Sequence, residues 1–365
     1  MVRIILVALA LSLPASFAQA EPLIVDHDRQ LAAALEPIVE QTRALHDLAR
    51  TNDASGLQKA LVAIRQNESL GPVARNHLLD QTLQALSLTA ATRESRELVQ
   101  AYIGHPVEVF IRHSEEHRSA VVPLYDLSAT AALTLRVWDE RKAAEIVAGR
   151  LRRGNWQSGS YLVTESSISL SAWQRGSVQA LSQSSVAQLT AARGGILASM
   201  NSGEQLGPAA LVAGIRLHDT ELLRAVIARA QQKVALDAIQ SATQVLPPAE
   251  AYEVLNASLD RMDVASAAIL GIGSLLDSEP QAYDRLLQLL QDHNYGAAAA
   301  LAFARNESPR TLTHLRALIL SDSPQTTRLR AALALRLSAT PAARSLQAEL
   351  RDTMGIDTEM REALQ

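Results

Sequence analysis

The sequence predicts an all-α fold, an α-solenoid of stacked helical hairpins, on three observations. The segments Ala299–Phe303 and Ala331–Leu335 repeat nearly the same pattern 32 residues apart, and each precedes a polar break and a second apolar helix. Prolines recur at a similar interval, at positions 248, 280, 309 and 341. Hydrophobic residues make up 48% of the chain, and they are largely alanine and leucine, which are strong helix formers. A repeat of this length is typical of units that bury their apolar faces only by stacking.

The breaks between the paired helices carry residues that start helices. Ser308 and Thr340 can cap the free N–H groups of the next helix. Pro309 and Pro341 fill its first position, where a missing N–H costs nothing. Alanine pairs in the first helix of each block let neighbouring helices approach closely. The same pattern occurs upstream at residues 131–133, 209–211 and 267–269.

These residues resemble HEAT-like (armadillo-type) repeats in a short form, over residues 206–350. The resemblance implies a non-enzymatic scaffold whose stacked helices bind a protein or peptide partner. TPR repeats are the competing interpretation. They rank second because their aromatic-rich signature is hard to place in a chain with 3% aromatic residues.

Residues 1–20 have the features of a signal peptide. Arg3 gives a positive start, Ile4–Leu13 a short apolar stretch, and Ala18–Ala20 a small-residue cleavage site. The apolar stretch is too short to span a bilayer, and no later membrane-spanning segment is predicted. The chain has no cysteine, which excludes disulfides and a lipid-anchored cysteine. We therefore expect an exported protein, periplasmic or secreted, cleaved near Ala20.

The rest of the chain is predicted to have three parts. Residues 21–145 form N-terminal helical repeats, which begin with an amphipathic helix from Asp28 that Pro37 kinks. Within them, apolar and polar residues alternate around 107–123, which predicts a small β or irregular element. Residues 206–365 form the C-terminal HEAT-like repeats.

The middle part, residues 146–205, is either an inserted loop region or a solenoid unit with a functional polar face. Residues 146–203 hold five arginines and one acid, Glu165, in a chain with a net charge of −4. Arginine pairs with carboxylate or phosphate, and aromatic side chains anchor interfaces. The predicted contacts to an acidic or anionic partner are Arg150, Arg152, Arg153, Trp156, Tyr161 and Trp173. In the structural alternative, tryptophans fill gaps between irregular repeats and arginines cap helix C-termini.

The run His113-Ser114-Glu115-Glu116-His117 matches H-x-x-E-H and is similar to the zinc site of inverzincin metallopeptidases. The resemblance implies that, on a helix, His113 and His117 would bind zinc and Glu116 would activate water. The flanking residues instead indicate a strand or loop, and the family's downstream glutamate ligand has no evident counterpart. A solvated polar turn is the competing interpretation.

Other familiar sites are missing from the sequence. Gly271-Ile272-Gly273 lacks the third glycine of a dinucleotide-binding loop and is predicted to be a close-packing feature. No P-loop or G-x-S-x-G is present, so no cofactor is predicted. Export and the acidic balance outside the middle part disfavour nucleic acid. The leading hypothesis is a scaffold that binds a protein or peptide. The alternatives are a zinc-dependent or other hydrolase acting on peptide or cell-wall material, and a structural spacer subunit.

Overall fold

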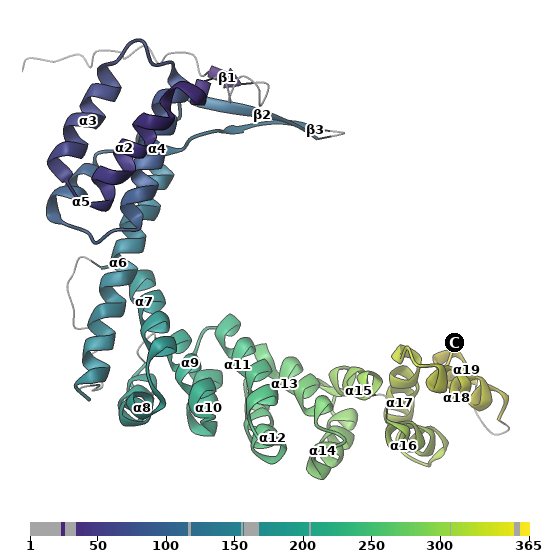
Figure 1. Cartoon of the computed structure of the whole chain (residues 1–365). Coiled ribbons are helices and arrows are strands. Elements are labelled where there is room, and N and C mark those ends of the chain that lie inside the picture. Colours follow the sequence, from purple (N-terminus) through teal and green to yellow (C-terminus); the bar gives the residue numbers. More distant parts are fainter. Residues whose placement is uncertain are drawn as a thin grey trace, which may run out of the picture. The chain divides into compact units, whose positions relative to one another are not determined.

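The computed structural model describes residues 23–25, 34–115, 118–154, 156, 168–203, 206–306, 308–353 and 358–365 (Figure 1). Within these residues the chain forms 18 α-helices, two short 3-10 helices and one three-stranded sheet. The predicted all-α solenoid class is therefore confirmed. The chain divides into two compact units, Met1–Trp138 and Asp139–Gln365, and the boundary lies inside helix α6 (Leu127–Arg152).

The first unit is built on helical hairpins. Its helices are α2 (Val39–Arg50), α3 (Ala54–Gln66), α4 (Pro72–Ser87), α5 (Arg93–Gln100) and the first part of α6. Their inward faces form one core in which leucine is the commonest residue, including Leu57, Leu78 and Leu83. The short 3-10 helix η1 (Glu36–Ile38) contains Pro37 and precedes α2, which is the interruption that the sequence predicts.

A small sheet completes the first unit. Strand β2 (Val109–Glu115) pairs in parallel with β1 (Leu23–Val25) and antiparallel with β3 (Arg118–Pro123). In the hairpin, Phe110 lies opposite Pro123. The β element predicted around 107–123 is therefore confirmed. The sequence did not predict β1, because three residues are too few to show a period of two.

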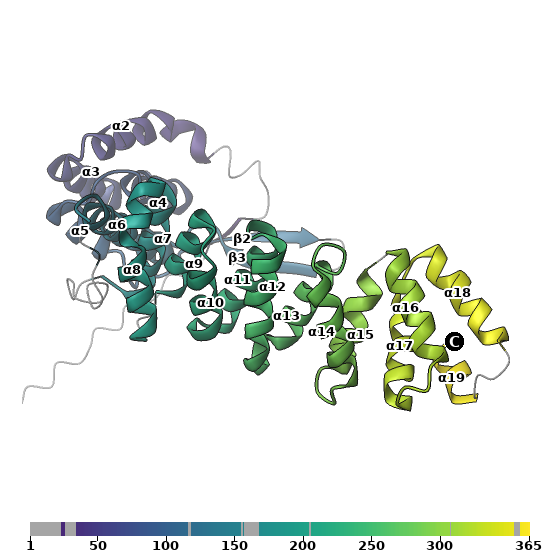
Figure 2. The same ribbon diagram turned by 90° about the horizontal axis from the view of Figure 1, so that it is seen from below.

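The second unit is a row of helices in two layers (Figures 1 and 2). Successive odd-numbered helices contact one another, and we call them the odd layer: α7 (Leu170–Gln183), α9 (Gly207–Leu217), α11 (Gln232–Val245), α13 (Met262–Ser274), α15 (Gly296–Arg305), α17 (Gln325–Leu337) and α19 (Thr358–Ala363). The even layer comprises α8 (Val186–Asn201), α10 (Thr220–Arg229), α12 (Pro248–Ala257), α14 (Pro280–Gln291), α16 (Pro309–Leu320) and α18 (Pro341–Asp352), with the short η2 (Ser258–Asp260) after α12.

The helix starts of this unit follow the predicted chemistry. The Oγ of Ser308 accepts a hydrogen bond from the Thr311 N–H at 3.3 Å, and the Oγ1 of Thr340 accepts one from the Ala343 N–H at 3.1 Å. Prolines 248, 280, 309 and 341 each stand in the first turn of an even-layer helix. These prolines and caps therefore fix where each second helix of a pair begins.

Small residues bring the odd-layer helices close together. The alanine pairs at 299–300 and 331–332 are fully buried. A Cβ added to Gly273 of α13 would lie 2.8 Å from the Cβ of Ala302 on α15, which is closer than two such atoms can approach. The prediction that the glycines at 271 and 273 serve close packing is therefore confirmed for Gly273.

The part of residues 146–205 that the structure describes is largely helical. Helices α7 and α8 both pack on α9, and their buried side chains belong to the core of the second unit. Gly176 of α7 lies so close to the Glu140 carbonyl of α6 that a Cβ would sit 2.4 Å from it. These two helices thus begin the stack.

Candidate binding surfaces

The odd layer exposes a repeated row of leucines. Leu211, Leu270, Leu301 and Leu333 are each half-buried, and each follows two fully buried residues on its helix. We call these four residues the leucine row. On α11 the matching position, 30 residues before Leu270, holds the exposed Gln240 after the buried Ala238 and Ile239. Leu211, Leu270 and Leu333 pack against the core of the second unit and keep part of their surface accessible. Four of the five matching positions are therefore partly accessible leucines.

Charges near the leucine row are few on α13 and α15 but more frequent on α17, which carries Arg328, Arg330 and Arg336. Helix α13 carries a single charged residue, Asp263, and α15 carries a single one, Arg305. On α11, Asp237 is paired with Lys233 at 3.0 Å. The exposed Arg305 and Arg336 follow Leu301 and Leu333 by four and three residues, which places both arginines on the same flank of the row. The row thus has basic side chains beside its last two leucines, on α15 and α17.

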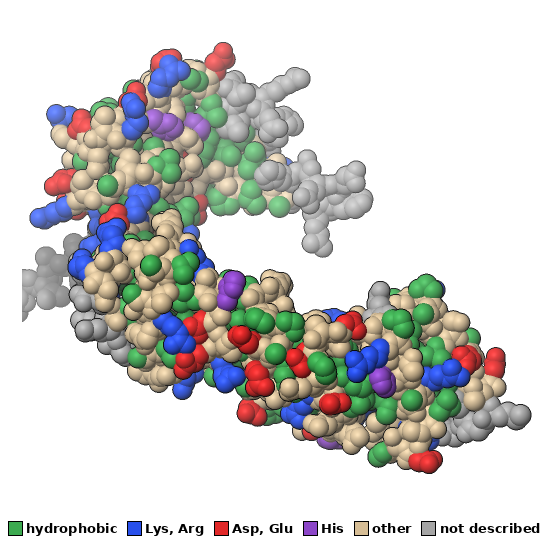
Figure 3. Space-filling model, turned by 60° about the horizontal axis from the view of Figure 1, so that its bottom comes forward, with side chains coloured by type: hydrophobic (Ala, Val, Ile, Leu, Met, Phe, Trp, Pro, Cys, Tyr) green, Lys and Arg blue, Asp and Glu red, His purple; other side chains and the backbone are tan. Residues whose placement is uncertain are grey.

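Other surfaces of the second unit are mixed in charge. On the face in Figure 3, acidic and basic side chains are interspersed and hydrophobic side chains lie between them. In the second unit, some charges are paired across repeats, such as Arg316 with Glu349, whose side chains are about half exposed. Such exposed pairs contribute little to stability, and on that face no single sign of charge dominates.

The structure brings some of the predicted basic and aromatic residues together. The guanidinium of Arg150, at the end of α6, lies over the ring of Trp173 on α7, 5.9 Å from its centroid. Burial, together with the nearby Arg153, lowers the pKa of Arg150. Arg152 and Arg153 are exposed at the C-terminus of α6. Their positive charges there also interact favourably with the negative end of the helix dipole.

The two tryptophans of this set are buried. Trp173 is 5% exposed and Trp156 is 7% exposed, and both belong to the core of the second unit. Trp156 packs against α8, where a Cβ on Gly195 would lie 2.2 Å from the Trp156 carbonyl oxygen. Tyr161 lies outside the described residues. Among the described members of the predicted binding set, Arg152 and Arg153 are exposed and Arg150 is half-buried.

The capping of helix C-termini that the structural alternative gives to arginine is carried out by arginines outside the predicted set. In the second unit, Arg216, Arg261 and Arg330 each donate to main-chain carbonyls at the end of a helix in a preceding repeat. Arg216 Nη1 donates to the Leu181 carbonyl at 2.8 Å, and Arg330 Nη1 donates to the Leu290 carbonyl at 2.7 Å. These residues satisfy carbonyls that the helix itself leaves open. The only sequence signal is their separation from those carbonyls by about one repeat.

Of the predicted zinc ligands, His113 lies on a strand and not on a helix. Residue 113 is in strand β2, opposite Ala120 of β3, so the one-turn helical spacing assumed for His113 and His117 is wrong at this end of the motif. Glu116 and His117 lie outside the described residues. Among the residues described, no group of three or more His, Cys, Asp or Glu side chains is arranged to hold a metal ion.

The first unit has a groove of about 380 Å³ between α3 and α5. Leu61, Leu98 and Tyr102 form its apolar floor, and Arg65, Glu94 and Glu97 stand among the residues of its wall. The Arg65 guanidinium lies 4.5 Å from the centroid of the Tyr102 ring. This cation–π contact joins two residues that line the groove.

A polar cluster links α4 to the start of α6. Asp80 accepts hydrogen bonds from the Thr130 hydroxyl at 2.7 Å and from the Gln84 amide at 2.6 Å. His77 Nδ1 lies 3.2 Å from the Tyr125 hydroxyl. Burial raises the pKa of Asp80 and lowers that of His77, and it raises the pKa of Tyr125 to about 12. All these groups have partners, which is typical of a structural cluster.

Comparison with known proteins agrees with this repeat arrangement. Residues 251–336 match a protein family described as HEAT repeats. No curated protein and no solved structure matches the chain. The matched region extends from α12 to α17 and includes three of the four leucine-row residues. This match and the two-layered stack of helix pairs together identify the chain as a HEAT-like repeat protein.

No helix in the described part of the chain is both long enough and apolar enough to cross a bilayer.

Proposed function

We propose that this protein is an exported scaffold that binds another protein or peptide along the odd layer of its second unit. One observation carries the proposal. The leucine row places a partly accessible apolar side chain on α9, α13, α15 and α17 at matching positions, and α13 and α15 carry one charged residue each. An apolar strip with a polar rim is typical of a protein-binding surface. Stacked repeats offer such a surface without a catalytic site.

Arg152 and Arg153 are proposed as a second contact, for acidic groups of the partner. They are exposed, adjacent and at the end of α6. Arginine forms paired hydrogen bonds with carboxylate or phosphate. Because the tryptophans beside them are buried, the contact consists of the charges alone and contributes more to the rate of association than to affinity.

Capture of partners tests the binding proposal. The mature chain is immobilised and exposed to an envelope extract of its source cells, beside Leu301→Ser with Leu333→Ser in one variant. The matched control is Leu320→Ser on α16, a leucine of the even layer that is 47% exposed. We expect the same protein to be retained by the wild type and the control and lost from the double variant. Equal retention by the wild type, the double variant and the control would rule out the odd layer as the binding surface.

Export is a separate part of the proposal. It rests on the signal-peptide features of residues 1–20. N-terminal sequencing of the protein purified from its source is the test, with Glu21 as the expected first residue. An N-terminus that retains Arg3 would contradict export.

The charge-reversal variant Arg152→Glu with Arg153→Glu tests the second contact in the same capture experiment. It is expected to slow association with the partner and to leave helicity unchanged.

A further inference from the structure

We propose that the groove between α3 and α5 binds a short peptide with free termini, about three or four residues long. The ammonium group of this peptide lies at Glu94 and Glu97, an apolar side chain fills the middle, and the carboxylate lies at Arg65. The site belongs to the first unit and goes beyond the proposed function, which concerns the odd layer of the second unit. It is drawn from the charges at the two ends of the groove, its length and its apolar middle.

Helices α3 and α5 run in parallel along the groove. At their N-terminal ends, Asn52 Nδ2 donates to the Ala90 carbonyl at 3.0 Å. At their C-terminal ends, the Arg65 guanidinium lies over the Tyr102 ring. Each side of the groove is one continuous helix face, because its lining residues recur at spacings of three and four. They include residues 54, 58, 61 and 65 of α3, and residues 94, 97, 98, 101 and 102 in and just after α5.

The two ends of the groove carry opposite charges. Glu94 and Glu97 stand on α5 toward its N-terminal end, whereas Arg65 stands at the C-terminal end of α3. Glu94 and Arg65 are both exposed. Glu97 pairs with Arg93 at 3.0 Å, but both side chains are largely exposed, and such a pair contributes little. A ligand with a positive group at one end and a negative group at the other complements this arrangement, and a peptide with free termini carries both charges.

The length of the groove sets the length of the peptide. Glu94 and Tyr102 are eight residues apart, and Ser55 and Arg65 are ten residues apart. At the rise of an α-helix, these separations correspond to about 12 Å and 15 Å. An extended chain spans about 3.3–3.6 Å per residue, so three or four residues cover most of this distance. A dipeptide is too short to reach both charged ends.

The middle of the groove is apolar. Leu61 and Leu98 lie on its floor, and Val62 lies beside them. Leu98 is half-buried, and Val62 is 44% exposed. An apolar side chain of the peptide placed there would remove part of their surface from water, which favours binding.

The size of the groove favours a small ligand over a folded partner. Its volume of about 380 Å³ lies near the low end of the range for pockets that hold small molecules, about 300–1,000 Å³. Eleven residues line the groove, whereas a stable interface between folded proteins uses about 20–30 residues on each side. A peptide longer than the groove would also carry one of its terminal charges past Glu94 or Arg65.

A series of synthetic peptides tests the inference. The probes consist of alanine with one central leucine, and they range from two to six residues with free termini. Matched probes of three and four residues carry either an N-terminal acetyl group or a C-terminal amide. Binding to the full mature chain is measured by calorimetry.

Two variants of the chain remove the charges at the ends of the groove. They are Arg65→Gln, and Glu94→Gln with Glu97→Gln. The matched control is Lys59→Gln, because Lys59 is an exposed cation of α3 that does not line the groove. Circular dichroism checks that each variant is folded.

We expect the peptides of three or four residues to bind best, and blocking either terminus to weaken their binding by about tenfold. In Arg65→Gln, the free and the amidated peptide should bind equally. In the variant of Glu94 and Glu97, the free and the acetylated peptide should bind equally, whereas Lys59→Gln should behave like the wild type. The blocked peptides keep the inference testable on the wild type if a variant fails to fold.

Three results would overturn the inference. They are no saturable binding of any peptide at millimolar concentration, blocked termini that leave affinity unchanged, or an affinity that rises steadily up to six residues. Leu301→Ser with Leu333→Ser should bind the peptides like the wild type, because the odd layer is a different surface. Failure of the peptides with capture that depends on the leucine row would therefore refute this site alone, and the reverse result would refute the proposed function alone.

Discussion

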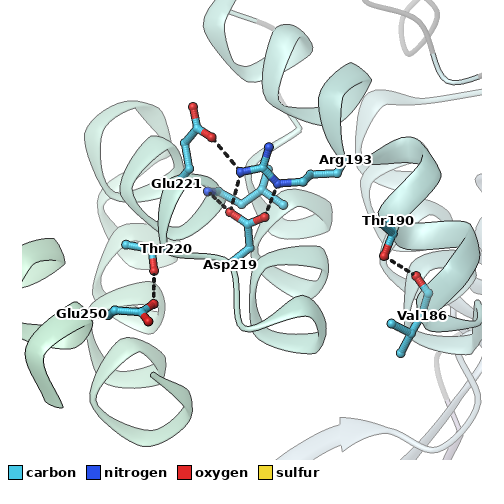
Figure 4. A network of polar contacts seen from close by, with 8 residues as sticks. Val186, Thr190, Arg193, Asp219, Thr220, Glu221 and Glu250 are labelled. Atoms are coloured by element: carbon cyan, nitrogen blue, oxygen red, sulfur yellow. Dashed lines mark hydrogen bonds and ion pairs between the residues drawn. The ribbon is translucent and has the colours of Figure 1, made fainter. Parts of the chain in front are cut away.

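Arg193 of α8 and Asp219, the N-cap residue of α10, form a two-pronged ion pair between successive repeats (Figure 4). The second prong, Arg193 Nη2 to Asp219 Oδ1, measures 3.1 Å, and the same nitrogen lies 2.6 Å from Glu221 Oε2. Asp219 also accepts a hydrogen bond from the Leu222 N–H at 2.9 Å. Its side chain is 10% exposed. One carboxylate therefore caps a helix and joins two repeats.

The pKa of Asp219 defines how this pair responds to acid. Burial alone would raise the pKa, but the hydrogen bonds from Arg193 and from the Leu222 N–H outweigh burial and hold it below its usual range. Because the pKa of Asp219 is lower in the folded chain than in the unfolded chain, the ion pair stabilises the fold at pH values above the ordinary carboxyl pKa. That stabilisation is lost as the pH falls through the folded pKa.

Arg193→Ala is expected to lower the free energy of unfolding at pH 7 by about 1–3 kcal/mol, because it leaves a largely buried carboxylate without its cation. The deficit should shrink below about pH 4, where Asp219 is protonated in the unfolded chain. Urea unfolding at pH 7 and at pH 3.5 measures the loss of stability and its reduction in acid. The control is Arg316→Ala, whose pair is about half exposed and should cost less than about 1 kcal/mol. Equal effects of the two substitutions would contradict the special role of Arg193.

Asp80→Asn is expected to stabilise the first unit at neutral pH. Burial raises the pKa of Asp80 despite its hydrogen bonds from Thr130 and Gln84. A raised folded pKa favours the protonated form, so stability is greatest below the unfolded pKa and declines as the pH rises through the folded pKa. The asparagine keeps an oxygen for Thr130 without a buried charge. A gain on the order of 1 kcal/mol is expected at pH 7.

The gain from Asp80→Asn should vanish near pH 3.5, where the carboxyl is protonated in both states. Thermal unfolding across this pH range is the measurement. Asp47→Asn is the matched control, since Asp47 is an exposed partner of Arg50 and its removal should change little. A loss of stability at pH 7 would show that the ionised form of Asp80 is the one that the fold prefers.

The fold was predictable because its signals are local and repeated. The prolines at 309 and 341 and their caps, Ser308 and Thr340, mark helix starts within four residues of sequence. The alanine pairs recur once per repeat, and a regular period of this length indicates stacked repeat units. In contrast, β1 consists of Leu23–Val25, which pair with residues far along the chain. Nothing within three residues signals such a distant partner.

The candidate site was only partly predictable, because exposure depends on neighbours. Leu301 and Leu333 follow alanine pairs and have the composition of core residues, but the structure leaves them half-buried. Trp156 and Trp173 have the composition of an interface, but they are buried. An aromatic side chain beside arginines serves equally well as a core residue or as an anchor. Only the packing of α7 and α8 distinguishes the two.

Tyr283→Phe is expected to be neutral or to raise the free energy of unfolding by up to about 1 kcal/mol. Tyr283 is 5% exposed, and its hydroxyl has no hydrogen-bond partner among the described residues. Burial raises its pKa to about 12. The matched control is Tyr295→Phe, because the Tyr295 hydroxyl donates to the Leu259 carbonyl at 3.3 Å. That substitution should lower stability by about 0.5–1.5 kcal/mol. A larger loss at Tyr283 than at Tyr295 would show that the hydroxyl has a partner.

Adjacent glycines of α8 give the sharpest test of how Trp156 is held. A Cβ on Gly194 meets nothing within 4 Å, so Gly194→Ala should stabilise the helix by about 0.5–1 kcal/mol. A Cβ on Gly195 would lie 2.2 Å from the Trp156 carbonyl oxygen and 2.7 Å from its ring. Gly195→Ala should therefore lower the melting temperature and shift the tryptophan fluorescence to longer wavelength, because the indole must leave its contact. Equal stabilisation by both substitutions would mean that Trp156 does not pack on α8, and it would return this tryptophan to the set available for a partner.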